Sequence, residues 1–430
     1  MKYSRIKGTV DIMGEDLGYW YAIENATKKV ARLYGYSEIR TPIIEPTELF
    51  VRGVGNETDI VQKEMYSFED KGGRNISLRP EGTAPVVRAF IENSLINRGF
   101  PQRLFYIGPM FRYERPQKGR QRQFHQIGFE LFGSESPLAD VEMITLLVRI
   151  LREMGLMNFK VVINSIGCEK CRPNYKKALK EYYSHHLDEV CDDCKRRYNT
   201  NILRLLDCKV DVEIAKAAPK SADYLCDECR SHYERLKKYL KILNIEFEED
   251  HRLVRGLDYY NRTVFEVRHK GLGGQDAIAG GGRYDKLIEE LGGPHVPAVG
   301  FAAGIERLIL AMKSEGVEVP PPIVHHVYIA HIGDVIEEAL EIAEDLRRKG
   351  LTVDFDVMER SLRAQLKHAD RIGALLSVII GENELERDVV VVRDMETGEQ
   401  TEVDINFAAD LILDKVREKG MILESLKFGG

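Results

Sequence analysis

The stretch VEVPPPIV places three consecutive prolines, Pro320 to Pro322, in the last third of a chain of 430 residues. A helix cannot continue through such a run, because proline lacks the backbone N–H and its ring clashes with the preceding turn. Proline-rich segments also act as semi-rigid spacers. We therefore expect a linker at 319–325 that separates two folded parts of the chain.

The two sides of this linker have different patterns. Over 326–430 the stretches follow the order strand, helix, strand, helix, strand and hairpin, which predicts a small α/β domain. Residues 1–166 and 249–318 mix helical periodicity with strand-like runs such as RLFYIGPMFRYE and RTVFEVRHK. Between them, 167–248 is mostly helical in pattern and rich in Lys, Glu and Tyr, so we interpret it as an inserted subdomain.

Composition excludes several classes of protein. The chain is 43% hydrophobic, enough for a large core, and its net charge of -7 means that a nucleic-acid partner must be held by a local basic patch. The N-terminus has no apolar run fit for a signal peptide, and no segment reaches the roughly 18 apolar residues of a membrane helix. We expect a soluble cytoplasmic protein that does not bind membranes.

All seven cysteines lie within the inserted stretch, and six of them form CxxC pairs: Cys168/Cys171, Cys191/Cys194 and Cys226/Cys229. In a reducing compartment such pairs favour a thiolate zinc site over disulfides, since one turn offers two sulfurs to a tetrahedral metal. The alternative is a set of buried thiols that bind nothing. Seven thiols exceed one tetrahedral shell, so the sequence leaves the ligands open, and Cys208 stands apart from the pairs.

The stretch SLRPEGTAPVVRAF, residues 77–90, predicts a strand that enters a turn and then a helix beginning near Thr83. Glu81 lies in that turn, where it can point into a cleft and accept a hydrogen bond from a cationic amine. The alternative is a carboxylate that only stabilises the start of the helix through its dipole.

The stretch FRYERPQKGRQRQFHQIGFELFG, residues 111–133, predicts two strands around an arginine-rich loop. On the second strand, alternate residues share one face and place an aromatic ring, an amide and a carboxylate together: Phe124, Gln126 and Glu130. A buried carboxylate needs a partner, so a ligand is one interpretation and a solvated hairpin is the other. His125 faces away from that surface, which favours a structural role.

Two further stretches combine glycines with charged residues. AGGGRYDKL contains Gly280 to Gly282, which allow a ligand and the backbone to approach closely. In AVGFAAGIERLIL, Arg307 lies at an apolar helix start, where an arginine either extends to solvent or meets an anion. The stretch LVRGLDYYNRTVFE adds an arginine, an aspartate and two adjacent tyrosines.

Together these stretches resemble the class II aminoacyl-tRNA synthetases, and LVRGLDYYNRTVFE with GGGRYD resembles the two signatures of the histidyl-tRNA synthetase family. YGYSEIRTPIIEPTELF, with Pro42, is similar to the dimer-forming motif 1; the arginine-rich hairpin is similar to motif 2, and VGFAAGIERLIL to motif 3. The resemblance implies an α/β (α+β) fold: a catalytic antiparallel sheet core with helices over 1–166 and 249–318, a helical insertion, and a C-terminal anticodon-binding domain. It also implies a homodimer.

The activity that this resemblance implies is the ligation of histidine to tRNA(His), using ATP with Mg²⁺. Histidine first forms an adenylate and is then transferred to the terminal ribose of the tRNA. The resemblance makes Arg112 and Arg255 catalytic and assigns ATP to Arg112, Arg120, Phe124 and Arg307. It assigns histidine to Glu81, Thr83, Gln126, Glu130, Arg255, Tyr259, Tyr260 and Tyr284.

Three alternatives come from other functional classes. A regulatory subunit that senses histidine typically lacks the C-terminal domain and the motif residues, both of which this chain retains. A tRNA-sensing stress domain is expected beside a kinase, and a generic nucleotide-binding enzyme is expected to carry a GxxxxGK[ST] loop; neither feature is found in the sequence.

A basic stripe at helical spacing is suited to tRNA phosphates or to plain solvation: Arg360, Arg363, Lys367 and Arg371.

Overall fold

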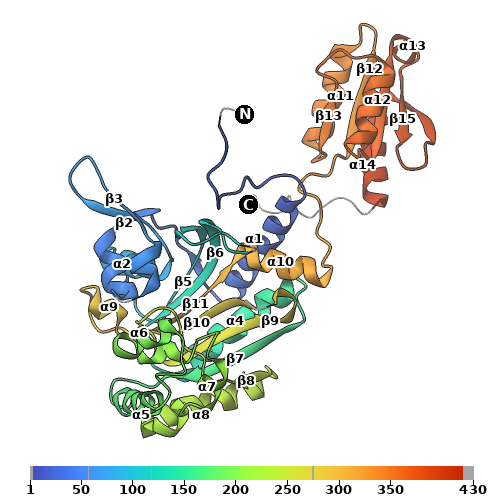
Figure 1. Cartoon of the computed structure of the whole chain (residues 1–430). Coiled ribbons are helices and arrows are strands. Elements are labelled where there is room, and N and C mark those ends of the chain that lie inside the picture. The colour runs from blue at the N-terminus through green and yellow to red at the C-terminus, as the bar shows by residue number, and fades with distance from the viewer. Residues whose placement is uncertain (1–2, 57, 118, 274–275, 420–430) are drawn as a thin grey trace. The chain divides into compact units, whose positions relative to one another are not determined.

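The computed structural model describes residues 3–56, 58–117, 119–273 and 276–419, so the ends of the predicted domains at 1–2 and 420–430 lie outside the described residues. The chain forms two compact units, Met1–Pro320 and Pro321–Gly430, and the division falls within the proline run (Figure 1). We call the first the catalytic unit, after the role that the family resemblance implies for it, and the second the C-terminal unit. No helix in the described ranges is long and apolar enough to cross a membrane.

An eight-stranded sheet forms the centre of the catalytic unit. Neighbouring strands are antiparallel except at the two edges, where β1 pairs with β5 and β7 pairs with β8 in parallel. The antiparallel core predicted from the sequence is therefore confirmed. Its strands, in sheet order, are β1 (Ser37–Glu38), β5 (Gln102–Phe111), β6 (Gln123–Phe132), β11 (Ala298–Gly304), β10 (Ala277–Arg283), β9 (Asn261–His269), β7 (Phe159–Ser165) and β8 (Phe247–Glu249).

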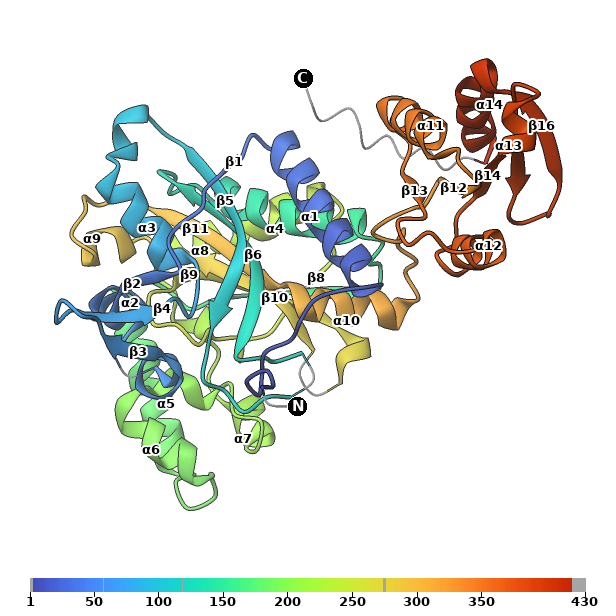
Figure 2. The same ribbon diagram turned by 90° about the horizontal axis from the view of Figure 1, so that it is seen from above.

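One face of this sheet is apolar and lies under helices. Phe129 stacks on Phe105 and Phe301 at ring-centroid distances of 5.4 and 5.2 Å, and all three are buried. Helices α1 (Asp16–Leu33), α4 (Pro137–Glu153), α8 (Asp227–Ile242) and α10 (Ile305–Glu315) share the same buried cluster, and α1 and α10 lie alongside the sheet in Figure 2. Because side chains alternate along a strand, the even-numbered residues of β6 face the other way, as do the positions of Gly280 and Gly282 on β10. A register shift between Ala277 and Ala279 interrupts the alternation in β10, and Ile278 belongs to the core cluster.

Smaller elements surround that second face. A three-stranded sheet has the order β2 (Ile44–Pro46), β4 (Asn75–Leu78) and β3 (Tyr66–Glu69), beside helices α2 (Thr47–Val54) and α3 (Thr83–Glu92). A π-helical turn (Ile60–Glu64), a 3₁₀ turn (Leu95–Arg98) and the short helix α9 (Leu287–Glu290) complete this part, whereas a 3₁₀ turn at Lys270–Leu272 lies against α10. The inserted stretch between β7 and β8 is helical, as the sequence predicts, with α5 (Arg172–Ser184), α6 (Asp192–Thr200), α7 (Val212–Ala217), α8 and 3₁₀ turns at Ile202–Leu205 and Ser221–Tyr224.

The C-terminal unit is a mixed α/β layer. Its five-stranded sheet has the order β13 (Val353–Phe355), β12 (Val327–Ile332), β14 (Leu376–Gly381), β15 (Val389–Asp394) and β16 (Gln400–Asp404). The first three strands are parallel, and the pairs β14–β15 and β15–β16 are antiparallel. Its helices are α11 (Ile336–Arg348), α12 (Leu362–Arg371), α13 (Glu382–Leu385) and α14 (Ile405–Glu418). The alternation read from the sequence describes this order, but it does not include the short helix α13 or the final helix α14.

The predicted basic stripe on α12 is shorter than expected. Arg363, Lys367 and Arg371 are exposed at four-residue spacing, so they share one face of the helix. Arg360 precedes the helix and binds the buried Asp356, with Nε 2.5 Å from Oδ1. The stripe therefore consists of three residues, and Arg360 anchors the turn before them.

A buried guanidinium joins the sheet to the helices of the catalytic unit. Arg283, at the end of β10, has no exposed side-chain surface and forms ion pairs with Asp140 of α4 and, at 3.0 Å, with Asp285. It also donates to the carbonyl oxygens of Ser134 (2.7 Å) and Ser136 (3.1 Å) in the turn after β6. Burial alone raises the pKa of Asp140, but the charges and hydrogen bonds of Arg283 and His232 together outweigh it, and the pKa of that carboxyl falls below its ordinary value.

Replacing Arg283 with methionine is expected to lower the free energy of unfolding by about 3–5 kcal/mol, because it leaves the Asp140 carboxylate buried without its partner. Urea unfolding followed by tryptophan fluorescence measures this change in the catalytic unit, since Trp20 is the only tryptophan. The control Arg52→Met removes an exposed ion pair with Glu48 and is expected to cost less than about 1 kcal/mol. Equal costs for the two variants would contradict this account of Arg283.

Candidate active site

A polar cavity of about 660 Å³ lies within the catalytic unit, over the face of the sheet that the core helices leave uncovered. Its floor consists of small residues of β10 and β11, among them Gly280, Ala302 and Gly304. Every residue that the sequence assigned to histidine or ATP lines it, except Glu130 and Tyr284: Glu81, Thr83, Arg112, Arg120, Phe124, Gln126, Arg255, Tyr259, Tyr260 and Arg307.

The glycines of the floor leave space for charged side chains. A Cβ on Gly280 would collide with the guanidinium of Arg255, and one on Gly300 would collide with the carboxylate of Glu130. Gly300 pairs with Glu130 across β11 and β6, and with Gly282 across β11 and β10. The glycine run therefore allows ionic groups to lie directly on a sheet.

Carboxylates and hydroxyls gather at one end of the cavity. Thr83 Oγ1 donates to Glu130 Oε1 at 2.7 Å, and the Tyr284 hydroxyl donates to Glu130 Oε2. Glu130 is 1% exposed, so the interpretation of its strand as a solvated hairpin is wrong. Glu81 accepts from the backbone N–H groups of Thr83 and Ala84, both at 2.8 Å, so it caps helix α3 and lines the cavity as well.

The electrostatics of this end favour a cation. Burial raises the pKa of Glu130 to about 8, against the hydrogen bonds from Tyr284 and Thr83, which lower it. Burial also raises the pKa of Glu81. A positively charged ligand would relieve both shifts, because it favours the ionised carboxylates.

An unused acceptor points to the same conclusion. Gln126 Oε1 is buried without a hydrogen-bond partner among the residues that the structure describes. A buried carbonyl oxygen left unpaired costs on the order of 1–3 kcal/mol, so a donor on a ligand would stabilise it. The cavity thus has an amide oxygen and a carboxylate available to an amine.

Guanidinium groups gather at the other end. Arg112 donates from Nε to the Pro80 carbonyl oxygen at 2.9 Å and lies 5.3 Å from the centre of the Phe124 ring. Arg120 pairs with Glu114 at 2.8 Å. Burial lowers the pKa of the Arg307 guanidinium, and the positive charge of Arg120 lowers it further, so an anion bound here would relieve their repulsion.

Arg255 stands over a different part of the floor. Its Nη1 donates to Glu266 Oε2 of β9 at 2.9 Å, and its guanidinium lies above Gly280 of β10. Arg112 follows β5, and β6 and β11 separate β5 from β10 in the sheet. The two arginines can therefore approach one anion from different sides.

Comparisons with known proteins give the family. Residues 8–308 match the family model described as histidyl-tRNA synthetase, and residues 326–415 match the one described as an anticodon binding domain. The chain belongs to the histidyl-tRNA synthetase family. It is 64% identical to the histidine–tRNA ligase of Thermotoga sp. (strain RQ2), over 97% of this chain and 99% of that protein. It is 65% identical to the histidine–tRNA ligase of Thermosipho africanus, over 94% of this chain and 97% of that protein.

A solved structure agrees with this family. The crystal structure of apo S. aureus histidyl-tRNA synthetase superposes with a TM-score of 0.81 at 38% identity, covering 95% of this chain and 99% of that one. The catalytic core, the insertion and the C-terminal unit are thus all within the matched length.

The insertion of this synthetase supplies a cavity wall that the sequence did not reveal. Arg197 Nη2 binds Asp59 Oδ2 at 3.0 Å, and Asn201 Nδ2 binds Asp258 Oδ1 at 2.9 Å. The wall residues come from α6 and the segment after it: Arg196, Arg197, Thr200, Asn201, Arg204 and Asp207. The only signal was the basic run KRRYN beside a CxxC pair, which has no periodicity that distinguishes it from a solvated helix.

His125 lies on the core side of the sheet. Its Nδ1 is 3.0 Å from Glu306 Oε1, and its ring meets Trp20 edge to face at a centroid distance of 4.7 Å. The side chain fastens β6 to helices α10 and α1, on the face opposite to Phe124 and Gln126.

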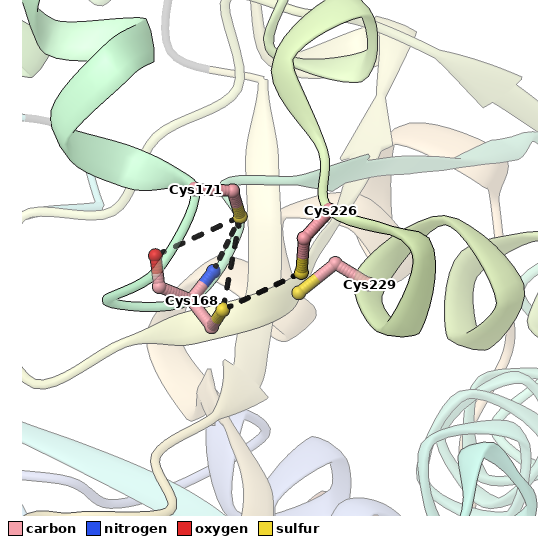
Figure 3. Close-up of side chains that lie close together, drawn as sticks. All are labelled: Cys168, Cys171, Cys226 and Cys229. Atoms are coloured by element: carbon pink, nitrogen blue, oxygen red, sulfur yellow. Dashed lines mark hydrogen bonds between the residues drawn. The ribbon is translucent and has the colours of Figure 1, made fainter.

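The cysteines form two clusters. In Figure 3 the side chains of Cys168, Cys171, Cys226 and Cys229 converge from the starts of two helices, with the Cys168 sulfur 3.8 Å from those of Cys171 and Cys226. The remaining CxxC pair, Cys191 and Cys194, forms a second cluster with Cys208 and Asp211. Cys208, which the sequence left apart from the pairs, lies 3.7 Å from Cys191, sulfur to sulfur. Tertiary contact, not sequence spacing, brings it there.

The buried Glu130 predicts a pH effect on stability. Its pKa is raised from 4.5 to about 8 in the folded protein, so between these values unfolding releases a proton. The free energy of unfolding therefore falls as the pH rises from 4.5 to about 8, and Glu130→Gln is expected to remove this part of the decline. Urea unfolding between about pH 5 and pH 8, followed by Trp20 fluorescence, measures it.

A matched control is Glu135→Gln, a substitution of an exposed carboxylate in the turn after the same strand. This variant is expected to keep the wild-type pH slope. If Glu130→Gln kept the slope as well, the proton would not reside on Glu130.

Proposed function

We propose that the cavity activates histidine with ATP and Mg²⁺, as the first of two steps by which this chain ligates histidine to tRNA(His). The observation that carries the proposal is a single cavity with a carboxylate end and a guanidinium end over one floor of small residues. Histidine brings an ammonium and an imidazole, and ATP brings phosphates. The reaction needs no nucleophile from the protein, only positioning and charge stabilisation.

Histidine binds at the carboxylate end. Its α-amino group donates to Glu81 and to the unused Gln126 Oε1, next to Thr83. Its imidazole lies between Tyr260 and the hydrogen-bonded group of Thr83, Glu130 and Tyr284. Glu130 and Tyr284 lie just beneath the cavity surface. A carboxylate accepts a hydrogen bond from one ring nitrogen, and a phenol donates to or accepts from the other. An aliphatic amino acid would leave both the carboxylate and the phenol unpaired.

Tyr259 is a wall of this pocket. Its ring lies 4.6 Å from that of Tyr260 and 5.5 Å from that of Tyr284, centroid to centroid. The three rings are buried, so the pocket keeps its shape before histidine enters. Such preorganisation lowers the entropic cost of binding.

ATP binds at the guanidinium end. Phe124 stacks on adenine, Arg112 contacts the α-phosphate, and Arg120 and Arg307 hold the outer phosphates together with Mg²⁺. Arg255 lies near the histidine carboxylate and the α-phosphate, on the other side from Arg112. As the carboxylate oxygen attacks the α-phosphorus, pyrophosphate leaves and the two guanidinium groups stabilise the charge on the phosphate oxygens.

The second step places the terminal ribose of tRNA(His) at the adenylate. The C-terminal unit supports tRNA binding, since it matches an anticodon binding domain and exposes Arg363, Lys367 and Arg371 on one helix face. These cations contact phosphates, so the affinity for tRNA falls as the salt concentration rises.

The test is histidine-dependent exchange of labelled pyrophosphate into ATP, without tRNA and with each of the twenty amino acids. Exchange is expected with histidine alone. Arg255→Ala is expected to lower the exchange rate about 10²- to 10³-fold, as removal of one charge-stabilising donor does in other enzymes. Arg255→Lys is expected to recover part of it, because an ammonium keeps the charge but not the paired geometry.

Arg252→Ala is the matched control. Arg252 belongs to the same loop and pairs with Asp250, but it is not among the described residues that line the cavity. It is expected to keep near-normal exchange. Exchange at the wild-type rate in Arg255→Ala would remove the charge-stabilising role of Arg255.

We also propose a homodimer through the segment around Pro42. Ile43 and Ile44 are 41% and 50% exposed, although both are large and apolar. The buried Arg79 donates to the carbonyl oxygens of Thr41 (2.9 Å) and Pro109 (2.9 Å), which links this segment to the strand that leads to Arg112. A partner on this surface thereby supports the cavity.

Ile44→Glu is expected to produce monomers, because it places a charge in the apolar contact. Sedimentation velocity measures the mass. The control Ile242→Glu, at the exposed end of α8, is expected to remain dimeric. A wild-type chain that sediments as a monomer would refute the proposal.

Finally, we propose a structural zinc in the four-cysteine cluster and a cytoplasmic location. Sulfurs around a tetrahedral zinc, with Zn–S bonds of about 2.3 Å, lie about 3.8 Å apart, and those of Cys168, Cys171 and Cys226 match this spacing. None of the seven cysteines, all of which the structure describes, forms a disulfide, which agrees with a reducing compartment.

A further inference from the structure

The second cysteine cluster has the dimensions of a metal site. The donor atoms of Cys191, Cys194, Cys208 and Asp211 all lie within 4.8 Å of one another. The sulfurs of Cys191 and Cys208 are 3.7 Å apart, and Cys208 Sγ is 3.3 Å from Asp211 Oδ2. A tetrahedral zinc with bonds of about 2.3 Å to sulfur and about 2.0 Å to oxygen has edges of about 3.8 and 3.5 Å.

We propose that these four residues bind a second tetrahedral divalent ion of the zinc class, and that this ion holds the insertion wall of the substrate cavity in place. The role of the wall rests on the proposed function, whereas the metal site does not. No pair of these cysteines would account for the cluster as a disulfide, since three thiols and a carboxylate converge and a disulfide would leave one thiol over.

The surrounding backbone favours charged ligands. Cys191 is the N-cap of α6 and Cys194 lies in its first turn, where the helix dipole stabilises a thiolate. The Asp211 carboxylate accepts from the backbone N–H of Cys191 at 3.1 Å, and the N–H of Asp211 donates to Cys208 Sγ at 3.4 Å. These bonds orient the donors toward a common centre, as outer hydrogen bonds do at metal sites.

The ligands enclose the segment that forms the wall. Cys194 and Cys208 stand on either side of residues 195–207, which contribute Arg196, Arg197, Thr200, Asn201, Arg204 and Asp207 to the cavity. The ends of this segment come together at the cluster. An ion bound there closes the segment into a loop and fixes the positions from which these side chains extend.

Packing alone holds α6 weakly. The structure describes every residue of α6, and Cys194 is its only buried one. Tyr198, in the second half of the helix, is only partly buried against the same core cluster, so the first turn of α6 gains little from apolar contact apart from Cys194. The 3₁₀ turn after it is anchored by Ile202, Leu203 and Leu205, which leaves the start of α6 dependent on the cluster.

The four-cysteine cluster provides an internal control. Cys226 and Cys229 belong to the start of α8, and no described residue of that helix lines the cavity. Loss of a metal there removes a link between the insertion and the sheet but leaves the loop of 195–207 closed. The two sites are thus separable by substitution.

The experiment measures metal content and activity in the full chain. Wild type purified without chelators is expected to hold two zinc equivalents by mass spectrometry, and two Co²⁺ equivalents with thiolate charge-transfer absorption after exchange. Cys208→Ser and Asp211→Asn are each expected to lose one equivalent, and Cys226→Ser to lose the other. In Cys208→Ser, kcat/KM for histidine-dependent pyrophosphate exchange is expected to fall about 10- to 100-fold, because the wall is displaced.

Each outcome decides a separate point. The site would be overturned if the wild type held a single metal equivalent and Cys226→Ser removed it. Full metal content in both Cys208→Ser and Asp211→Asn would overturn it as well. Metal loss in Cys208→Ser with unchanged exchange would overturn its role in the wall. Two metal equivalents in a wild type that shows no exchange with any amino acid would instead refute the proposed function and leave the metal site standing. Asp211→Asn keeps the shape of the side chain, so it tests the site if Cys208→Ser does not fold.

Discussion

The catalytic unit depends on one buried guanidinium. Arg283 ties the end of β10 to Asp140 of α4 and to two carbonyl oxygens in the turn after β6. Tyr284 follows it directly in the chain, and its hydroxyl reaches Glu130 of β6. His232 of the insertion adds a further contact, with Nε2 3.3 Å from Asp140 Oδ2. One ion network therefore sets the distances among the sheet, the insertion and the histidine pocket.

One face of the sheet packs into the apolar core and stabilises the fold, and the other carries the polar side chains of the cavity. Odd-numbered residues of β6 enter the apolar core, where Phe129 stacks between two other aromatic rings. Even-numbered residues present an aromatic ring, an amide and a carboxylate to the opposite side. The strength of the packing on the first face allows the second to carry glycines and buried charges, which cost stability.

This alternation explains what the sequence could predict. Phe124, Gln126 and Glu130 were placed on one surface because a strand repeats every two residues, and family resemblance supplied roles that spacing could not. The proximity of Cys208 to Cys191 could not be predicted, because the two cysteines are 17 residues apart in the chain and a folded segment brings them together. The arginines of the insertion wall could not be predicted because they follow no periodic pattern. Helical spacing places Arg360 on the helix, but the helix begins after it, and its ion pair with Asp356 depends on a turn that spacing does not reveal.

The glycine floor limits how this cavity can change. Gly280 and Gly300 have no side chains whose rotation could widen or narrow the site, and the carboxylate and guanidinium above them occupy the space that a methyl group would need. Adaptation to a different amino acid therefore has to come from the loop around Tyr259 and Tyr260, the start of α3 and the insertion wall. At Gly280 and Gly300 the sheet acts as a fixed template, so evolution or redesign has to alter what stands around these two positions.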